Sequence, residues 1–210
     1  LFNEAGYCLE ELGEYDKAIK YYNKALKEKE NDYSLAHLGF CYRNIHKPAK
    51  ALTYFTKAIR INPGYSWAIG ELAYCYELLK KYQLALKEYF RNLSIKPDDS
   101  FSYAHIGYIY IELGTKSQNR KKQLTKIIKE NDYYTKAIFF LKKAVQLDPK
   151  YVWALSELGF VLRLCGRFKE AIIYLEKAIS IHNRDEWIYN ELGCCYEQTG
   201  DYEKASKSFI

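Results

Sequence analysis

The sequence of 210 residues contains no methionine, four prolines and eleven glycines, and it has no run of eighteen apolar residues. Without such a run, none of its segments can form a transmembrane helix. The scarcity of proline and glycine, and of alternating β-branched residues, excludes a chain built mainly of turns and strands. With 49% apolar and 28% charged residues, the composition is that of a folded chain rather than a disordered one. We therefore predict an all-α protein.

One small residue recurs as a marker along the chain. The six markers are Gly6, Gly39, Ala73, Gly107, Gly159 and Gly193, and the spacings between them are 33, 34, 34, 52 and 34 residues. Each marker is followed by an alanine that has a bulky residue four positions after it. The alanine stands thirty residues after the fourth marker and twelve residues after each of the other five. These pairs are Ala18 and Tyr22, Ala51 and Phe55, Ala85 and Tyr89, Ala137 and Leu141, Ala171 and Leu175, and Ala205 and Phe209. A period in the thirties that contains two helical patterns indicates a solenoid of stacked helix pairs.

This pattern resembles the tetratricopeptide repeat, or TPR, family, whose repeats carry W-x2-L-G-x2-Y and then A-x3-F. The resemblance implies a right-handed α-solenoid of about six helix-turn-helix repeats, forming a single array over residues 1–210. The expected repeats are residues 1–31, 32–65, 66–99, 100–151, 152–185 and 186–210, the last of them incomplete. Turns between paired helices are expected at Gly13, Gly114, Gly166 and Gly200. One departure is Asn92, which replaces a small residue of the second helix in the third repeat.

Both ends of the sequence fall inside expected helices, and the chain begins with Leu1 rather than methionine. The terminal repeats of a solenoid normally carry a polar capping face. We therefore expect the sequence to be a piece of a longer protein, with solenoid ends that are open to further repeats or to another copy.

The long fourth spacing predicts an insertion of about eighteen residues in the fourth repeat, at residues 115–132. It carries a net charge of +4, and its apolar residues Leu124, Ile127 and Ile128 favour a short amphipathic helix docked on its neighbours. One interpretation is a solvated helical extension. The other is a second contact site for an acidic partner or nucleic acid, formed by Lys116, Arg120, Lys121, Lys122 and Lys126.

The cysteines and histidines are explained by their positions in the repeat. Cys8, Cys41, Cys75 and Cys195 all stand two residues after a marker, where other repeats have Ile109 or Val161. Such a position is an apolar packing site, so we predict reduced thiols and a cytoplasmic protein, with no metal site and no cofactor. The sequence shows no nucleophile–base pair and no phosphate-binding glycine loop, and we therefore predict that the chain is not an enzyme.

Aromatic residues gather on the expected inner face of the first helices. Six residues before the markers stand Tyr33, Trp67, Phe101, Trp153 and Trp187. One residue after them stand Tyr7, Phe40, Tyr74, Tyr108 and Phe160, with Cys194 in the last repeat. Aromatic side chains have few rotamers and are favoured anchors at binding surfaces. The alternative is that the rings stack between successive helices and only tighten the solenoid.

The same face carries polar residues two positions before every marker: Glu4, His37, Glu71, His105, Glu157 and Glu191. The inner positions together contain nine glutamates and two arginines, a sum of −7 in a chain of net charge +6. This asymmetry argues against a nucleic acid in the groove and favours a peptide with basic and apolar residues.

We therefore predict a non-enzymatic interaction module that binds a peptide or protein segment in an acidic, aromatic concave groove. The alternative function is a structural spacer or self-assembling scaffold segment of a larger TPR protein, associating through its open solenoid ends.

Overall fold

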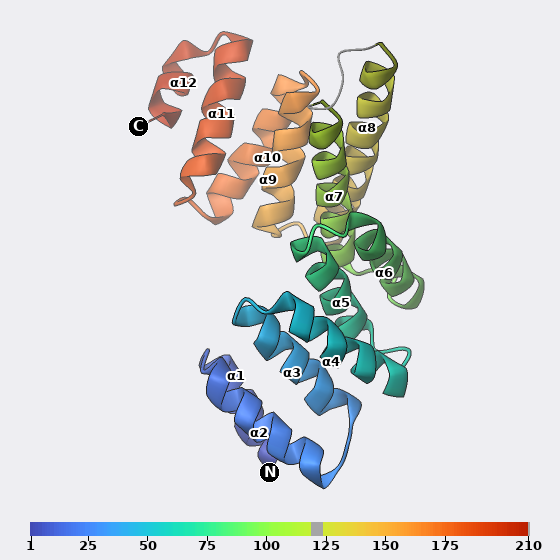
Figure 1. The fold of residues 1–210 in the computed structure, drawn as a ribbon. Helices are drawn as coiled ribbons and strands as arrows, with labels where there is room; N and C mark the ends of the chain where they lie inside the picture. The colour runs from blue at the N-terminus through green and yellow to red at the C-terminus, as the bar shows by residue number, and fades with distance from the viewer. Residues whose placement is uncertain (119–123, 210) are drawn as a thin grey trace. The chain divides into compact units, whose positions relative to one another are not determined.

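The structure is a computed structural model that describes the backbone of residues 1–118 and 124–209, and side chains outside residues 117–131. Within these ranges the chain forms twelve helices and no strand, which confirms the all-α prediction (Figure 1). The helices are α1 (Phe2–Glu11), α2 (Tyr15–Glu28), α3 (Asp32–Asn44), α4 (Pro48–Ile61), α5 (Ser66–Leu78), α6 (Tyr82–Ile95), α7 (Ser100–Gln118), α8 (Leu124–Leu147), α9 (Val152–Leu164), α10 (Phe168–Ile181), α11 (Glu186–Thr199) and α12 (Tyr202–Ser208).

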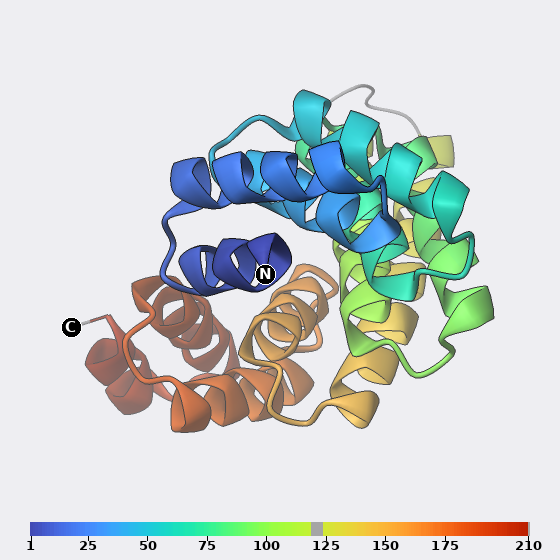
Figure 2. The same ribbon diagram turned by 90° about the horizontal axis from the view of Figure 1, so that it is seen from below.

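The helices divide into two compact units, Leu1–Pro97 and Asp98–Ile210. In the first unit the helices pair as α1 with α2, α3 with α4, and α5 with α6; in the second they pair as α7 with α8, α9 with α10, and α11 with α12. Figure 2 shows the members of a pair lying side by side, as α1 and α2 do in dark and lighter blue. Within a unit, successive first helices also touch, α1 with α3 and α3 with α5 in the first, α7 with α9 and α9 with α11 in the second. The predicted single array over both units stays a prediction.

The marker residues let the two helices of a pair approach closely. A Cβ atom added at Gly39 would lie 3.0 Å from the Phe55 ring, and one added at Gly159 would lie 2.5 Å from Cγ of Leu175. Phe55 and Leu175 are fully buried, as are the alanines four residues before them. The small marker and the bulky residue of the second helix therefore form one interlocking contact, repeated along each unit.

The turn between paired helices has the same backbone conformation in five of the six pairs. Seven residues after the marker, Gly13, Gly166 and Gly200 adopt positive φ, and His46 and Lys80 do so at 58° and 56°. The next amide donates to a carbonyl five residues back, as Lys47 N does to Tyr42 O at 2.9 Å. This is the Schellman arrangement that ends a helix.

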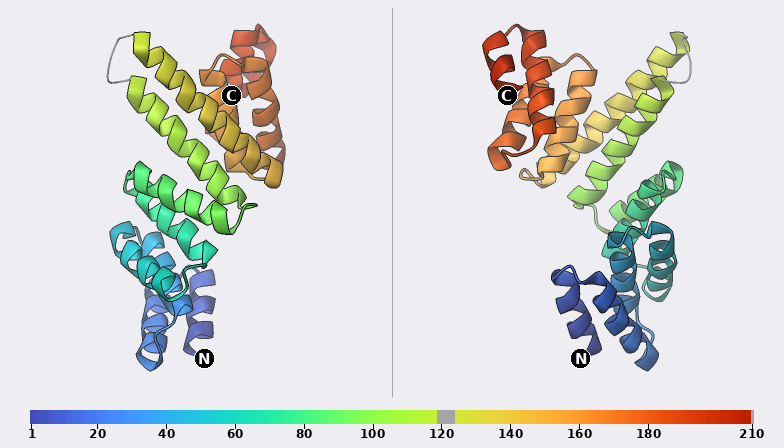
Figure 3. Two further views of the ribbon diagram at one scale, coloured as in Figure 1. Left: turned by 90° about the vertical axis from the view of Figure 1, so that its right-hand side faces the viewer. Right: turned by 60° about the vertical axis from the view of Figure 1, so that its left-hand side comes forward.

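The fourth repeat corrects two predictions. Gly114 lies inside α7 rather than in a turn, because α7 continues to Gln118 and α8 begins at Leu124. The described residues of the insertion thus lengthen both helices of one pair, visible as the long green and yellow helices in Figure 3, and they belong to α7 and α8 rather than to a separate helix. Gly114 allows close packing instead, since a Cβ atom there would lie 2.6 Å from Cε1 of Tyr134.

The buried cysteines confirm the packing role of their position. Cys41, Cys75 and Cys195 are fully buried. Cys8 is exposed, because α1 has only α2 and α3 as neighbours.

Asn92 is also buried, and the hydroxyl of Ser66 donates a 2.7 Å hydrogen bond to its side-chain oxygen. A Cβ atom at Gly70 would be 3.5 Å from the Asn92 amide nitrogen, so Gly70 leaves room for the larger side chain.

Candidate functional site

The aromatic residues predicted for the binding face differ in exposure. Tyr7, Tyr33, Trp67 and Trp187 are exposed, with exposed fractions between 36% and 43%. The other rings are half-buried: Phe40, Tyr74, Phe101, Tyr108, Trp153 and Phe160. Fully buried aromatic residues of the chain, such as Tyr22 and Phe55, lie instead on second helices. Four of the rings on the first helices are therefore partly solvated, while Phe40, Trp153 and Phe160 also pack against the core.

The polar residues two positions before the markers are mostly buried. His37, Glu71, His105 and Glu191 are each less than a tenth exposed. Glu157 is half-buried, and Glu4 is exposed. Most of this row therefore lies between successive first helices, with its polar groups held by protein partners.

Two glutamates of this row pair with arginines of the preceding repeat. In the first unit Nε of Arg43 lies 2.7 Å from the Glu71 carboxylate. In the second unit Arg163 contacts Glu191 through Nε and, at 3.3 Å, through Nη2. Each arginine stands four residues after its own marker. The sum of −7 already includes both arginines, so the two pairs contribute no net charge to this face and leave the sum unchanged.

Each of these arginines also stacks on an aromatic ring. The guanidinium carbon of Arg43 is 4.6 Å from the Phe40 ring centroid and 5.3 Å from that of Tyr74. Arg163 is 5.4 Å from the Phe160 ring centroid. Each of these guanidinium groups therefore has both an acidic partner and an aromatic partner within the protein.

A buried carboxylate organises the start of the first unit. Glu10 in α1 accepts hydrogen bonds from the hydroxyl of Tyr22 and from Nδ1 of His37, both at 3.0 Å, and from Sγ of Cys41 at 3.6 Å. Burial, together with the Glu10 carboxylate, raises the pKa of Tyr22 and of Cys41 far above their ordinary values. These two side chains remain neutral donors, so they stabilise the carboxylate without neutralising it.

Four rings surround His37. Its ring centroid lies 4.2 Å from that of Tyr33, 4.8 Å from Trp67, 5.5 Å from Tyr22 and 5.9 Å from Tyr7. Tyr7, Tyr33 and Trp67 come from three successive first helices, α1, α3 and α5. The structure thus brings together four residues that the sequence predicts for the binding face.

The second unit contains a related arrangement around His105. Its ring centroid lies 4.1 Å from that of Phe101 and 4.5 Å from that of Trp153. Trp153 also contacts Tyr108 at 5.6 Å. At the next repeat, Trp187 packs against Phe160 with 5.6 Å between centroids.

The candidate second contact site lies largely outside the described residues. Arg120, Lys121 and Lys122 fall in residues 119–123, and the side chain of Lys126 belongs to the part that is not described. Lys116 is described at the end of α7, where its ammonium lies 3.8 Å from the Glu112 carboxylate.

Sequence reasoning missed the role of Glu10 and its partners. Glu10 was counted as a groove charge, whereas the structure buries it under His37. The sequence does contain a pattern that indicates this contact. In the first and third repeats the bulky residue of the second helix is a tyrosine, Tyr22 or Tyr89, and in the same two repeats a glutamate stands four residues after the marker. Tyr89 likewise donates to Glu77, at 3.1 Å.

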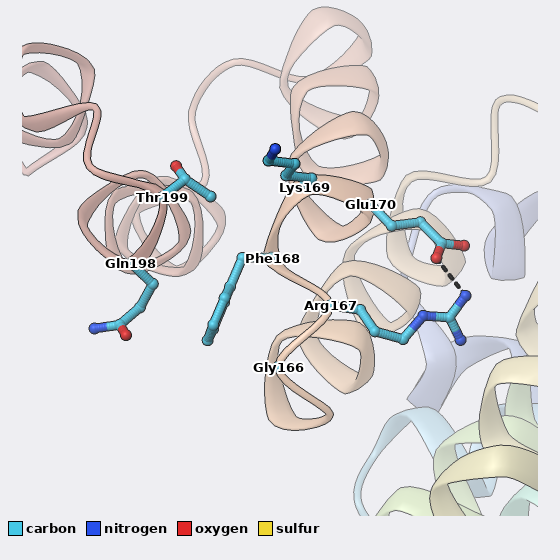
Figure 4. A pocket seen from close by; sticks show the side chains of 7 residues that line it. All are labelled: Gly166, Arg167, Phe168, Lys169, Glu170, Gln198 and Thr199. Atoms are coloured by element: carbon cyan, nitrogen blue, oxygen red, sulfur yellow. Dashed lines mark hydrogen bonds and ion pairs between the residues drawn. The ribbon is translucent and has the colours of Figure 1, made fainter.

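A pocket lies away from the aromatic face, at the turn between α9 and α10. Its lining residues are Gly166, Arg167, Phe168, Lys169, Glu170, Gln198 and Thr199. In Figure 4 the Phe168 ring points towards Gln198 at the end of α11, while Arg167 pairs with Glu170 on the other side. Lys142 also binds Glu170, at 2.7 Å, and lowers the pKa of that carboxyl. Arg167 and Glu170 at this pocket are thus already paired.

The described residues contain no group of three or more His, Cys, Asp or Glu side chains that could hold a metal ion. Among them there is also no helix long and apolar enough to cross a membrane.

Comparison with solved structures shows the fold. The chain is similar to pilF of Pseudomonas aeruginosa, with a TM-score of 0.83 at 13% identity over 99% of this chain and 86% of that one. It is also similar to a TPR protein of Thermus thermophilus, with a TM-score of 0.66 and 21% identity; the match covers 84% of this chain and 87% of that one. A third similar structure is YrrB, described as a TPR protein with an unusual peptide-binding site, with a TM-score of 0.65 at 16% identity over 89% and 88%. At these identities the likeness concerns the fold alone.

Family comparisons agree along the sequence. No curated protein matches the chain. Models of the tetratricopeptide repeat match residues 1–32, 33–65, 54–87, 126–151 and 150–209. The chain belongs to the tetratricopeptide repeat family.

Proposed function

We propose that the chain is a non-enzymatic module that binds an extended segment of a protein partner along its first helices. The observation that carries this proposal is the exposure of Tyr7, Tyr33, Trp67 and Trp187, each more than a third exposed although a partner ring holds it in place. Large rings that are fixed by neighbours and still face solvent lose little entropy on binding and offer much apolar area. They are therefore suited to act as preformed anchors.

The family supports a role in protein interaction, since the matched models all describe the tetratricopeptide repeat. The description of YrrB as a protein with a peptide-binding site is consistent with a peptide or extended segment as the ligand. A concave groove formed by the first helices is part of this proposal.

The charge of the partner follows from those acidic groups that remain at the surface. Glu71 and Glu191 are held by arginines and contribute little. Glu4, Glu11 and Glu197 are exposed on first helices. Selection for basic residues would therefore act at α1 in the first unit and at α11 in the second, while the other first helices of each unit would select by shape and apolar contact. An acidic nucleic-acid backbone does not fit these positions.

The proposal includes a cytoplasmic location. It rests on Cys41, Cys75 and Cys195, which are buried as packing side chains in the way that reduced thiols are.

The test is capture of proteins from native lysate by the immobilised chain, compared between two double variants. One variant carries Trp67→Leu and Trp187→Leu. The matched control carries Phe90→Leu and Phe139→Leu, which remove rings of similar exposure, 43% and 57%, from second helices. Proteins identified by mass spectrometry are then tested as synthetic overlapping peptides, so that the bound segment is defined by its own sequence.

We expect the tryptophan variant to lose a protein that both the unchanged chain and the control retain, with thermal unfolding midpoints of the two variants within a few degrees. Equal capture by both variants would contradict binding on the first helices. A large drop in the unfolding midpoint of the tryptophan variant alone would instead support the rings as packing elements of a spacer. Concentration-dependent self-association that the tryptophan variant loses would point to a scaffold.

A further inference from the structure

The rings of Tyr7, Tyr33 and Trp67 meet over one buried residue of the first unit, His37. We call these four residues the His37 ring cluster. Tyr7 is 43% exposed, Tyr33 36% and Trp67 37%, whereas His37 is only 7% exposed. The three outer rings are contributed by α1, α3 and α5, which touch one another in sequence. The cluster is thus a solvent-facing group of π faces with an imidazole beneath it.

Beneath this cluster lies a buried negative charge. The Glu10 carboxylate is in contact with His37, and its described hydrogen-bond donors are the Tyr22 hydroxyl, His37 Nδ1 and the Cys41 thiol. The Tyr22 hydroxyl and the Cys41 thiol are uncharged donors, so neither of them cancels the charge of the carboxylate. A charge in a low-dielectric interior acts over a longer range than one in water. The rings above it therefore stand in a negative potential.

An exposed glutamate on α1, Glu11, adds to this potential. Glu4 is exposed as well, but its carboxylate pairs with the terminal ammonium of Leu1. The nearby Glu11 carboxylate raises the pKa of the Tyr7 phenol, and burial followed by the Glu10 charge raises that of Tyr33. Arg43, on the neighbouring part of α3, is engaged by Phe40 and Glu71.

We propose that the His37 ring cluster binds the ammonium or guanidinium group of a lysine or arginine side chain in the partner segment. The π faces of the three outer rings and the buried carboxylate both attract a cation, and the aliphatic stem of such a side chain can pack along the rings. This inference rests on the proposed function, and it names the residue type that the first unit selects.

Trp187 in the second unit provides the contrast within the same chain. It is 40% exposed and packs against Phe160, much as Trp67 packs against Phe40 at 5.8 Å. Arg163 stacks on the same Phe160 ring and pairs with Glu191, so a guanidinium already lies on this aromatic pair. The Asp185 carboxylate near Trp187 accepts a hydrogen bond from the Trp187 amide as the cap of α11. We therefore expect Trp187 to take an apolar side chain without preference for a cation.

The experiment titrates the full chain with three small probes and follows the tryptophan indole N–H signals by NMR. The probes are blocked lysine, blocked arginine and blocked norleucine, which has an uncharged aliphatic side chain. We expect the two cationic probes to shift the Trp67 signal, and norleucine to do so at least several-fold more weakly. The Trp187 signal should respond to the three probes alike.

Two variants locate the site. Tyr33→Leu removes an exposed ring and should weaken cation binding about 2- to 30-fold. Glu10→Gln keeps an oxygen acceptor for Tyr22 while it removes the charge, and it should weaken binding of the cations but not of norleucine. Phe139→Leu removes an exposed ring from α8, so it is the control and should leave cation binding at Trp67 unchanged. Should Glu10→Gln fail to fold, Tyr33→Leu and Phe139→Leu alone decide the outcome.

Equal shifts of Trp67 by norleucine and the cations, or cation binding that Tyr33→Leu does not weaken, would overturn this inference. Capture of a partner through Trp187 would then still support the proposed function. Conversely, selective cation binding at Trp67 combined with equal protein capture by the tryptophan and control variants would support the cluster and contradict only the proposed function.

Discussion

Tyr22 offers a sharp test of the buried Glu10 cluster, because the residue that replaces tyrosine elsewhere should be harmful here. Phe55 stands at the same position of the second repeat, so a phenylalanine fits the space beside the marker glycine. At Tyr22, however, the hydroxyl donates a 3.0 Å hydrogen bond to a carboxylate that is almost fully buried. Tyr22→Phe therefore removes a donor that water cannot easily replace.

The size of the effect follows from the charge of the acceptor. A hydrogen bond to a charged group contributes about 1.5–3 kcal/mol, and we expect Tyr22→Phe to lower the free energy of unfolding by that amount. Glu10→Ile introduces the residue that stands at the same repeat position in the fourth repeat, Ile111. In this variant the Tyr22 hydroxyl has lost its acceptor. Tyr22→Phe should then stabilise the chain, because it removes a buried hydroxyl that would otherwise be unsatisfied. The effect of Tyr22→Phe on the free energy of unfolding should thus change sign when Glu10 is replaced.

The assay is urea unfolding of the four variants of this double-mutant cycle, followed by circular dichroism, with midpoint and slope compared because repeat arrays can unfold in parts. Tyr89→Phe is the matched control: Tyr89 is also fully buried and donates to Glu77 at 3.1 Å, so it should be destabilising as well. A neutral or stabilising Tyr22→Phe in the unchanged chain, or a coupling below about 0.5 kcal/mol, would refute the hydrogen-bonded cluster as a source of stability.

Three further predictions concern single positions. Asn92→Ala restores a small residue but leaves the Ser66 hydroxyl without its acceptor, and it should lower the free energy of unfolding by about 1 kcal/mol in urea titrations. Gly200→Ala places a Cβ atom at φ 84° and should cost about 1 kcal/mol, seen as a lower thermal midpoint; an unchanged midpoint would contradict the left-handed cap. Iodoacetamide at pH 8 should alkylate exposed Cys8 and spare Cys75, whose pKa burial raises to about 12, as mass spectrometry of peptides would show. Since 12 lies above the ordinary value of 9.0, the contribution of Cys75 to stability is present below pH 9 and is lost as the pH rises towards 12, so unfolding midpoints should fall over that range.

The regular part of the fold is predictable because the same pattern of residue types occurs in every repeat. Small markers, alanines and bulky partners recur at fixed spacing, and their steric logic is local to one helix pair. The fourth repeat shows where this fails: Gly114 has the residue type of a turn and the position of a turn, yet it continues a helix. The inserted residues can extend α7 and α8 at once, and the close approach of Tyr134 gives the glycine another use. A glycine alone does not distinguish a left-handed turn from a crowded helix contact.

The repeat spacing predicts which residues share the face of the first helices, but it does not predict how the charges on that face pair. A position that is polar in every repeat suggests a solvated face, and by that reasoning Glu71 and Glu191 count as groove acids. In the structure this position meets the residue four places after the preceding marker, so Arg43 neutralises Glu71 and Arg163 neutralises Glu191. Such pairing depends on the offset between stacked repeats, which no single repeat contains. Because each arginine pairs with one of these acids, we propose that discrimination among partners depends on the exposed rings and on the buried Glu10 carboxylate, whose described donors are the Tyr22 hydroxyl, His37 Nδ1 and the Cys41 thiol.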